Sequence, residues 1–231
     1  MSAQGVHKIT ADFEEALCKY TGAPYAVALD NASNALFLAL YYELHIVWVI
    51  DTIIVPANTY PSVPCEIIHA GAKVKFKKIH PDSKRFGQTN SYYLTGPYRL
   101  SPTKVWDSAL TFTHNMYKKG THMCLSFTGP YKHLKLGKGG AILTDDEHAY
   151  NWFKKARFSG RDECSYHTDD FDKNPVIGWN FYMMPEIAAR GLLLIAQFYN
   201  QDGTPKSNPD LELPYPDLSK FKLWYQQNLV M

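Results

Sequence analysis

A lysine in a glycine-rich stretch is the first candidate for chemistry. Lys132 lies between a Gly-Pro pair and the glycine-rich turn at residues 137–140. Glycine has no β-carbon, so such a turn lets the backbone approach a bound ligand closely. A lysine amine acts as a nucleophile or proton carrier when burial or a nearby positive charge lowers its pKa. Beside Lys135 and Lys138, however, Lys132 taken alone reads as a solvated charge, and the adjacent His133 is the other titratable candidate.

An aspartate at the end of a short apolar run is the second candidate. Asp107 follows Val105 and Trp106, which we expect to form a buried strand. Ligands of α/β sheets bind beyond the carboxyl ends of the strands, so Asp107 could face one. The competing interpretation is a helix cap or turn, the commonest fate of an aspartate in this position.

Small polar residues form the third candidate. Asn31, Ala32 and Ser33 stand between an expected strand and an expected helix. The first N–H groups of a helix are unpaired and its N-terminus is partly positive, so this is a place where a phosphate could bind. An ordinary Ser/Asn helix cap explains the same residues equally well.

The spacing of apolar residues predicts the elements that must position these side chains. A helix is expected over residues 9–21 with Thr10 as its N-cap, because apolar residues recur three and four positions apart. Alternation of short apolar strands with helices predicts an α/β fold with a mostly parallel sheet and ligands at the carboxyl ends of its strands. The other expected strands are 25–29, 52–55, 73–77, 91–95, 104–106, 123–127 and 140–143, and the other expected helices are 35–44, 60–70, 146–157 and 184–199.

Length and charge narrow the class of protein. The 231 residues suffice for one domain, which we place at 1–200, followed by a Pro-rich tail at 201–231. A formal net charge of +2, with the signs interspersed, does not suggest a nucleic-acid or membrane partner. The chain opens on polar residues and has no apolar run of the ~20 residues that span a bilayer, so we expect a soluble, cytoplasmic protein.

The cysteines are too far apart to form a CxxC metal or redox motif. We therefore expect reduced thiols and no metal site. The four are Cys18, Cys65, Cys124 and Cys164.

Four motifs together resemble the DegT/DnrJ/EryC1/StrS family of sugar aminotransferases, which use pyridoxal phosphate (PLP) on the fold-type I scaffold. The most specific runs from Ser126 through Lys132 and the glycine-rich turn to Asp146, and the others are residues 105–109, 31–36 and 56–60. The resemblance extends over residues 13–194. It implies a three-layer αβα fold with a mostly parallel mixed sheet, like the large domain of fold-type I PLP aminotransferases.

The resemblance also implies a role for individual residues. Lys132 would be the lysine that forms a Schiff base with PLP, and Asp107 would keep the pyridine nitrogen protonated. Tyr60 would stack on the ring. Asn180 would reach the phosphate of the neighbouring subunit, which implies a homodimer with a shared active site. The phosphate of the same subunit would be held by Asn31, Ala32, Ser33 and Ser126.

The chain departs from the family pattern at several positions. Ser126 precedes Lys132 by six residues, one more than usual, so the phosphate contact could fall to Thr128 instead. Leu110 stands where the family usually has a polar group, often Gln, that contacts the cofactor's phenolic oxygen. The segment between residues 77 and 104 is short and lacks an expected helix, and the tail after residue 200 is too short for the family's C-terminal small domain.

Three functional hypotheses remain at this point. The first is a PLP-dependent aminotransferase that transfers an amino group from an amino acid, such as glutamate, to a nucleotide-linked keto-sugar. A dehydratase branch of the family has His in place of the lysine, so Lys132 favours transamination. The second is a shortened relative that dimerises and binds PLP without turnover. The third is an unrelated α/β phosphate-binding domain.

Overall fold

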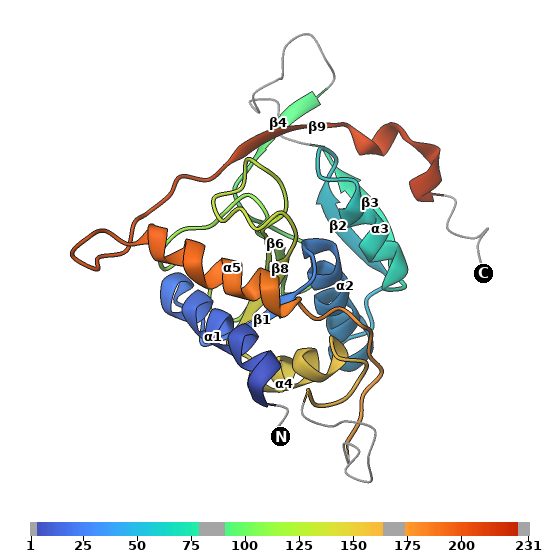
Figure 1. Cartoon of the computed structure of the whole chain (residues 1–231). Coiled ribbons are helices and arrows are strands. Elements are labelled where there is room, and N and C mark those ends of the chain that lie inside the picture. Colours follow the sequence, from blue (N-terminus) through green and yellow to red (C-terminus); the bar gives the residue numbers. More distant parts are fainter. Residues whose placement is uncertain (1–3, 79–90, 164–173, 226–231) are drawn as a thin grey trace.

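A five-stranded sheet forms the centre of the molecule. The computed structural model describes residues 4–78, 91–163 and 174–225. The strand order of the sheet is β1-β8-β7-β6-β5. Figure 1 labels β1, β8 and β6 near the centre of the molecule. Its strands are β1 (Tyr25–Leu29), β5 (Tyr98–Arg99), β6 (Val105–Asp107), β7 (His122–Ser126) and β8 (Gly140–Thr144). The predicted α/β class and mixed sheet are confirmed.

The sheet contains more antiparallel pairs than the sequence predicts. Within it, β6 and β7 are parallel, whereas β1–β8, β7–β8 and β5–β6 are antiparallel. A parallel connection needs a long crossover, usually a helix. The loop at 127–139 between β7 and β8 has no helix, so β8 returns beside β7 in the opposite direction. A separate parallel pair, β2 (Thr52–Pro56) and β3 (Lys73–Lys77), is joined through helix α3 (Ser62–His69).

Helices cover both faces of the sheet and give three layers (Figure 1). Side chains of successive strand residues point to opposite faces. In β1, Ala26 and Ala28 pack with the cluster formed by α1 (Gln4–Thr21) and α5 (Pro185–Ile195). Val27 and Leu29 pack with the cluster formed by α2 (Ala32–Tyr42) and α4 (Glu147–Ala156). The buried strands are therefore apolar on both faces, which is why they read as continuous apolar runs.

The ends of some helices differ from the prediction. Helix α1 begins at Gln4, so Thr10 lies inside the helix and is not its N-cap. Helix α5 ends at Ile195 and continues as a 3-10 turn at Ala196–Phe198. Asp146 caps α4, since its carboxylate accepts a 3.0 Å hydrogen bond from the backbone N–H of Ala149.

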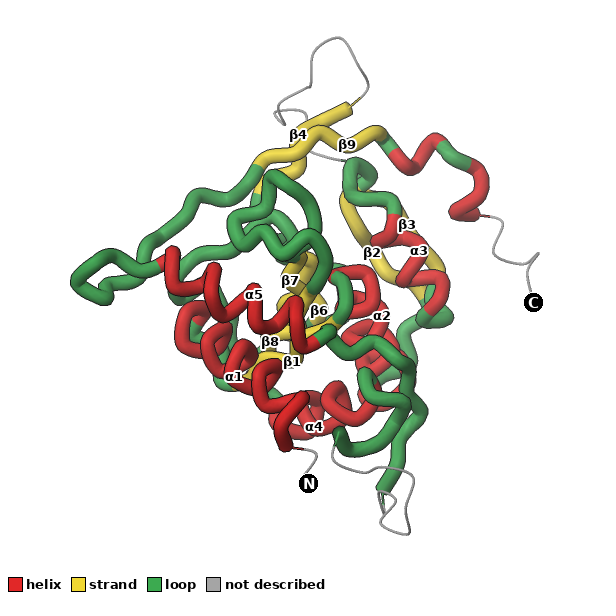
Figure 2. Tube along the Cα trace, in the orientation of Figure 1, coloured by secondary structure: helices red, strands yellow, loops and turns green. Residues whose placement is uncertain are grey.

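The C-terminal segment folds back over one end of the molecule. Strand β9 (Glu212–Pro216) pairs antiparallel with β4 (Ser91–Thr95), away from the central sheet (Figure 2). The predicted strand 91–95 is thus confirmed, but its partner is the tail. Two 3-10 turns, Leu218–Lys220 and Lys222–Tyr225, follow β9. Across the described ranges, no helix combines the length and apolar character needed to span a bilayer.

A buried ion cluster joins α4 to α1. Arg157 is completely buried and donates to the carboxylates of Glu14 and Glu163, and also to the carbonyl of Ala28 in β1. Lys154 lies 3.0 Å from Glu14 and 3.4 Å from Glu163. The cluster therefore fixes the N-terminal helix against the sheet through charge-assisted hydrogen bonds.

The cysteines of the described residues are unpaired. Cys18, Cys65 and Cys124 are free thiols, and Cys164 lies outside the described residues. Burial raises the pKa of Cys18 to about 11, so this thiol is protonated at neutral pH.

Candidate active site

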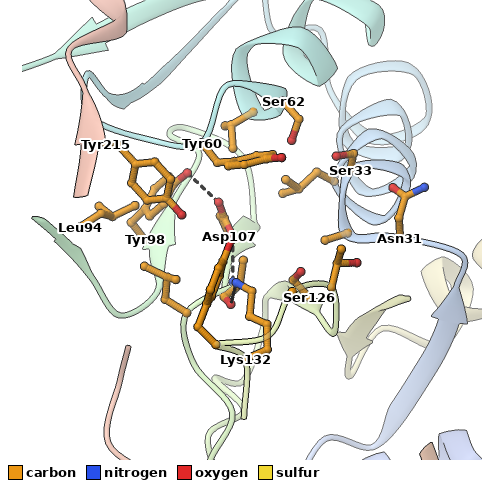
Figure 3. A pocket seen from close by; sticks show the side chains of 18 of the residues that line it. Asn31, Ser33, Tyr60, Ser62, Leu94, Tyr98, Asp107, Ser126, Lys132 and Tyr215 are labelled. Carbon is orange, nitrogen blue, oxygen red and sulfur yellow. Dashed lines mark hydrogen bonds between the residues drawn. The ribbon is translucent and has the colours of Figure 1, made fainter. Parts of the chain in front are cut away.

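A cavity of about 200 Å³ lies where β6 and β7 end beside the start of α2 (Figure 3). This is the carboxyl edge of the parallel pair, where the sequence places the ligand site. Leu110 and Thr128 line it as well. Seven of the eight residues to which the resemblance assigns a role line this cavity, namely Asn31, Ala32, Ser33, Tyr60, Asp107, Ser126 and Lys132.

Lys132 is buried, unlike the lysines around it. Its relative exposure is 7%, while Lys135 and Lys138 are exposed. The Nζ atom donates a hydrogen bond to the carbonyl of Ala109, two residues beyond Asp107. Burial lowers the pKa of Lys132, and the nearby charge of Asp107 opposes this effect. The interpretation of Lys132 as a solvated charge is therefore wrong.

Asp107 is held by two hydrogen bonds. Its Oδ2 accepts from the hydroxyl of Tyr98 at 2.7 Å (Figure 3). Its Oδ1 accepts from the backbone N–H of Ala109 at 2.9 Å. Burial raises the pKa of Asp107, whereas these hydrogen bonds and the charge of Lys132 lower it. The bond to Ala109 is that of a turn aspartate, so Asp107 both shapes the turn and faces the cavity.

Tyr98 and Thr59 extend this interaction, and neither was singled out from the sequence. A tyrosine hydroxyl has a single proton, and Tyr98 uses it in the hydrogen bond that it donates to Asp107. The Thr59 hydroxyl, 2.5 Å away, is therefore the donor to Tyr98. Strand β5 has two residues, too few to show a periodicity. The position of Tyr98 becomes visible only in the structure, where it pairs directly with Asp107 in the antiparallel register of β5 and β6.

In the turn before α2, Asn31 caps the helix and Ser33 lines the cavity. The side chain of Asn31 accepts a 2.8 Å hydrogen bond from the backbone N–H of Asn34, so the helix-cap interpretation is confirmed for this residue. Within the described residues, the hydroxyls of Ser33 and Ser126 have no hydrogen-bond partner. They reach the cavity from two elements beside a helix N-terminus, an arrangement that suits an anion.

The glycine-rich turn packs against this same turn. A β-carbon at Gly140 would lie 2.6 Å from the backbone nitrogen of Ala32 and 2.6 Å from the carbonyl carbon of Asn31. Real β-carbons are not found so close to backbone atoms. Gly140 thus lets β8 meet the backbone at residues 31–32, which brings Ser33 and the lysine loop to one cavity.

Besides Tyr98, three further tyrosines line the cavity. Tyr60 and Tyr131 are 54% and 51% exposed, and the rings of Tyr60 and Tyr215 lie edge to face with centroids 6.2 Å apart. Tyr215 comes from β9 in the tail and was not singled out from the sequence. Its neighbours Pro214 and Pro216 favour an extended backbone, which was the available signal.

Asn180 and His133 lie elsewhere. Asn180 is exposed, forms an isolated bridge with Phe158, and does not line the cavity of its own chain. Its contact with a partner subunit stays a prediction. His133 Nε2 donates a 2.8 Å hydrogen bond to the carbonyl of Pro209, and His133 is not among the lining residues.

The residues of the cavity fit PLP. An aldehyde needs an amine of lowered pKa, which Lys132 offers, and a protonated ring nitrogen needs a buried acceptor, which Asp107 offers. A phosphate needs free donors, which the Ser33 and Ser126 hydroxyls beside the start of α2 can supply. Within the described residues, no cluster of His, Cys, Asp and Glu side chains could hold a metal ion.

A three-layer α/β fold with this lysine and carboxylate at one cavity defines the fold-type I class of PLP-dependent proteins. The chain belongs to the DegT/DnrJ/EryC1/StrS aminotransferase family, which residues 5–87 and 113–204 match. Asp107, Leu110 and Tyr98 fall in the gap between the two matched stretches, and Tyr215 lies beyond them. A comparison of the sequence with curated proteins gave no match.

Solved structures with the same fold are distant in sequence. A protein from Bacillus cereus ATCC 10987, described as a PLP-dependent aminotransferase, has a TM-score of 0.62 at 18% identity, with 85% of this chain covered. The sugar aminotransferase CalS13 from Micromonospora echinospora has a TM-score of 0.62 at 16% identity, with 82% covered. The dehydratase ColD, which acts on GDP-4-keto-6-deoxymannose, has a TM-score of 0.61 at 16% identity, with 83% covered.

The chain is much shorter than these proteins. It spans 59%, 60% and 61% of their respective lengths. At these identities the likeness establishes the fold. Because an aminotransferase and a dehydratase both have this fold, the reaction must be argued from the residues of the site.

Proposed function

We propose that the chain is a PLP-dependent aminotransferase that moves an amino group from an amino acid, most simply glutamate, to the keto group of a nucleotide-linked sugar. The observation that carries the proposal is the buried Lys132 facing the same cavity as Asp107 and Ser126. Family membership supports the reaction class. The likeness in fold to the sugar aminotransferase CalS13 supports the substrate class.

Lys132 would move the proton. Transamination requires a base that takes a proton from one carbon and returns it to another, and bound PLP would supply the electron sink that makes this carbon acidic. The lowered pKa of Lys132 leaves more of its amine neutral near neutral pH than in a free lysine. Its Nζ, held at the carbonyl of Ala109, would be the atom that carries the proton.

Asp107 and the two serines would orient the cofactor. The carboxylate of Asp107 would accept a hydrogen bond from the protonated ring nitrogen and keep the positive charge there. The hydroxyls of Ser33 and Ser126 would donate to the phosphate, with Thr128 as the alternative to Ser126. Tyr60 would pack against the ring from the cavity edge.

The size of the cavity bears on the sugar substrate. Pockets that enclose a whole ligand have volumes of about 300–1,000 Å³. The cavity of about 200 Å³ is smaller, so the nucleotide part of a sugar substrate would extend beyond Tyr60 and Tyr131. If Asn180 reaches a neighbouring subunit, a homodimer would provide the remaining walls.

Amino transfer from glutamate tests the proposal. Purified protein with PLP should convert glutamate to 2-oxoglutarate in the presence of a nucleotide-linked keto-sugar from a panel. Lys132→Ala should lower the rate by about 10²–10⁴-fold, the usual contribution of a positioned acid or base. Lys135→Ala is the matched control in the same loop and should keep the rate. Binding of PLP without turnover across amino donors and sugars would instead support a non-catalytic, dimeric relative.

A further inference from the structure

The C-terminal strap, defined here as residues 208–218, includes β9, which runs beside β4 (Figure 2), and its residue Tyr215 lines the candidate active site. Its central part is β9, which pairs with β4 so that Tyr215 lies opposite Tyr92. The strap begins beyond the stretches that match the family, 5–87 and 113–204. The family match therefore assigns it no role.

One end of the strap is fastened to the segment that carries Asp107. The backbone N–H of Leu211 donates to the carbonyl of Leu110 at 2.8 Å. The hydroxyl of Thr111 donates to the carboxylate of Asp210 at 2.6 Å. Both contacts are made by residues within four positions of Asp107 in the chain. They therefore hold this end of the strap in a fixed position next to Asp107.

The other end is fastened to the loop that carries Tyr60. The side-chain amide of Asn58 donates to the carbonyl of Tyr215 at 2.8 Å, and Asn58 is buried. The backbone N–H of Leu218 donates to the carbonyl of Ala57 at 2.9 Å. The strap thus bridges the two loops that hold the stacking and carboxylate candidates, and its position is fixed at both ends.

Between these attachments, the side chain of Tyr215 enters the cavity. Tyr215 lies on the Asp107 side of the cavity, next to Tyr60 (Figure 3). Among the described residues its hydroxyl has no hydrogen-bond partner. Burial, followed by the nearby Asp107, raises the pKa of Tyr215, so the phenol keeps its proton and remains a donor.

We propose that Tyr215 contacts the substrate: its hydroxyl donates a hydrogen bond to an acceptor oxygen of the ligand that binds beside Lys132, and the strap closes the site over that ligand. Because this partly buried phenol has no partner among the described residues, an acceptor on a bound ligand can take the place of water as its hydrogen-bond partner. The acceptor is a carboxylate oxygen of the amino-acid donor or an oxygen of the keto-sugar. The proposal rests on the proposed function, because Lys132 defines where the substrate reacts.

Equilibrium binding tests the proposal without turnover. Lys132→Ala protein loaded with PLP is titrated calorimetrically with glutamate and, separately, with the nucleotide-linked keto-sugar. When Tyr215→Phe is added to this variant, the affinity for one of the two ligands should fall by about tenfold, which corresponds to the loss of one hydrogen bond of ~1.4 kcal/mol. The ligand that weakens is the source of the acceptor oxygen. Tyr215→Ala should weaken it further, because the ring is lost as well.

Matched variants separate this role from a general effect on folding. Tyr225→Phe changes the same residue type in the tail outside the cavity and should leave both affinities unchanged. Thr111→Val removes the attachment to Asp210 and should produce a smaller loss than Tyr215→Phe. Thermal unfolding of each variant should show that the strap variants remain folded.

The outcomes distinguish failure of this inference from failure of the proposed function. Unchanged affinity for both ligands in Tyr215→Phe, in protein that takes up PLP, would overturn the role of Tyr215 alone. Wild-type protein that takes up no PLP would overturn the proposed function and this inference together.

Discussion

Tyr98 donates a 2.7 Å hydrogen bond to Asp107, and both residues lie in the stretch between the two family-matched segments. The lysine loop and the turn before α2 fall within those segments, whereas the carboxylate does not. The carboxylate is nevertheless placed beside Lys132 because β6 pairs with β7 and ends at the same edge. A local tyrosine, itself held by Thr59, then fixes its orientation.

Replacement of Tyr98 by Phe should change the titration of Asp107. The ionised carboxylate loses a donor, so the pKa of Asp107 rises beyond the increase that burial already causes. The acid limb of the pH profile for amino transfer should therefore move to higher pH. Spectrophotometric titration of the PLP-loaded protein should show the same direction of change.

Thr59→Val is the control for this prediction. It removes the donor to Tyr98 but leaves the bond between Tyr98 and Asp107, so the acid limb should move less. An acid limb that stays in place in Tyr98→Phe would show that Tyr98 does not tune the carboxylate.

Substitution of Gly140 by Ala should weaken cofactor binding. The new β-carbon would overlap the backbone at residues 31–32 and separate the glycine-rich turn from the start of α2. Overpacking of this kind costs about 1–3 kcal/mol of stability. Gly137→Ala, at a φ of +82° with no atom within 4 Å, should cost about 1–2 kcal/mol through backbone strain alone. PLP titration should show weaker binding for Gly140→Ala only, and equal affinities would contradict the packing role.

Because of Lys132, the free energy of unfolding of the cofactor-free protein should change with pH in the alkaline range. Its pKa is lowered in the folded state, so the unfolded chain binds more protons between that value and the ordinary pKa of about 10.4. The stability of wild type relative to Lys132→Met should rise with pH through this window. Urea unfolding at several pH values measures the difference, and a difference that is flat or falls would mean that Lys132 is not buried as described.

The buried ion cluster should be sensitive to loss of one partner. Arg157→Met leaves the buried Glu14 and the partly buried Glu163 without their main counter-charge and should destabilise the fold by about 3–5 kcal/mol. Lys8→Met breaks the exposed pair with Asp12 and should change stability by less than about 0.5 kcal/mol. Similar urea midpoints for the two variants would contradict the structural role of Arg157.

Local patterns predicted the elements well but not their partners. The strands predicted at 73–77 and 91–95 have the observed bounds, because both segments contain β-branched or aromatic residues that favour strands locally. The pairing of β4 with β9 joins two segments that are more than a hundred residues apart in the sequence, and no local pattern predicts such a contact. The excess of antiparallel pairs follows from the missing helix in the β7–β8 loop, a feature visible only after the sheet order is known.

The candidate site likewise contains residues that a local motif predicted and residues that only the fold brings to the cavity. Lys132 and Ser33 carry a motif and were singled out from it, although burial alone distinguishes Lys132 from Lys135. Tyr98 and Tyr215 have no motif, and they reach the cavity through strand pairing and the fold of the tail. Residues that act through such long-range placement need the structure to reveal them.

The covalent bond between Lys132 and PLP is the most direct test of the whole account. Protein incubated with PLP is reduced with borohydride, digested and mapped by mass spectrometry. The added mass of the reduced cofactor should be found on Lys132, with Lys135 and Lys138 unmodified at equimolar PLP. Modification spread over the exposed lysines, with Lys132 unmodified, would contradict the assignment of this cavity as a PLP site.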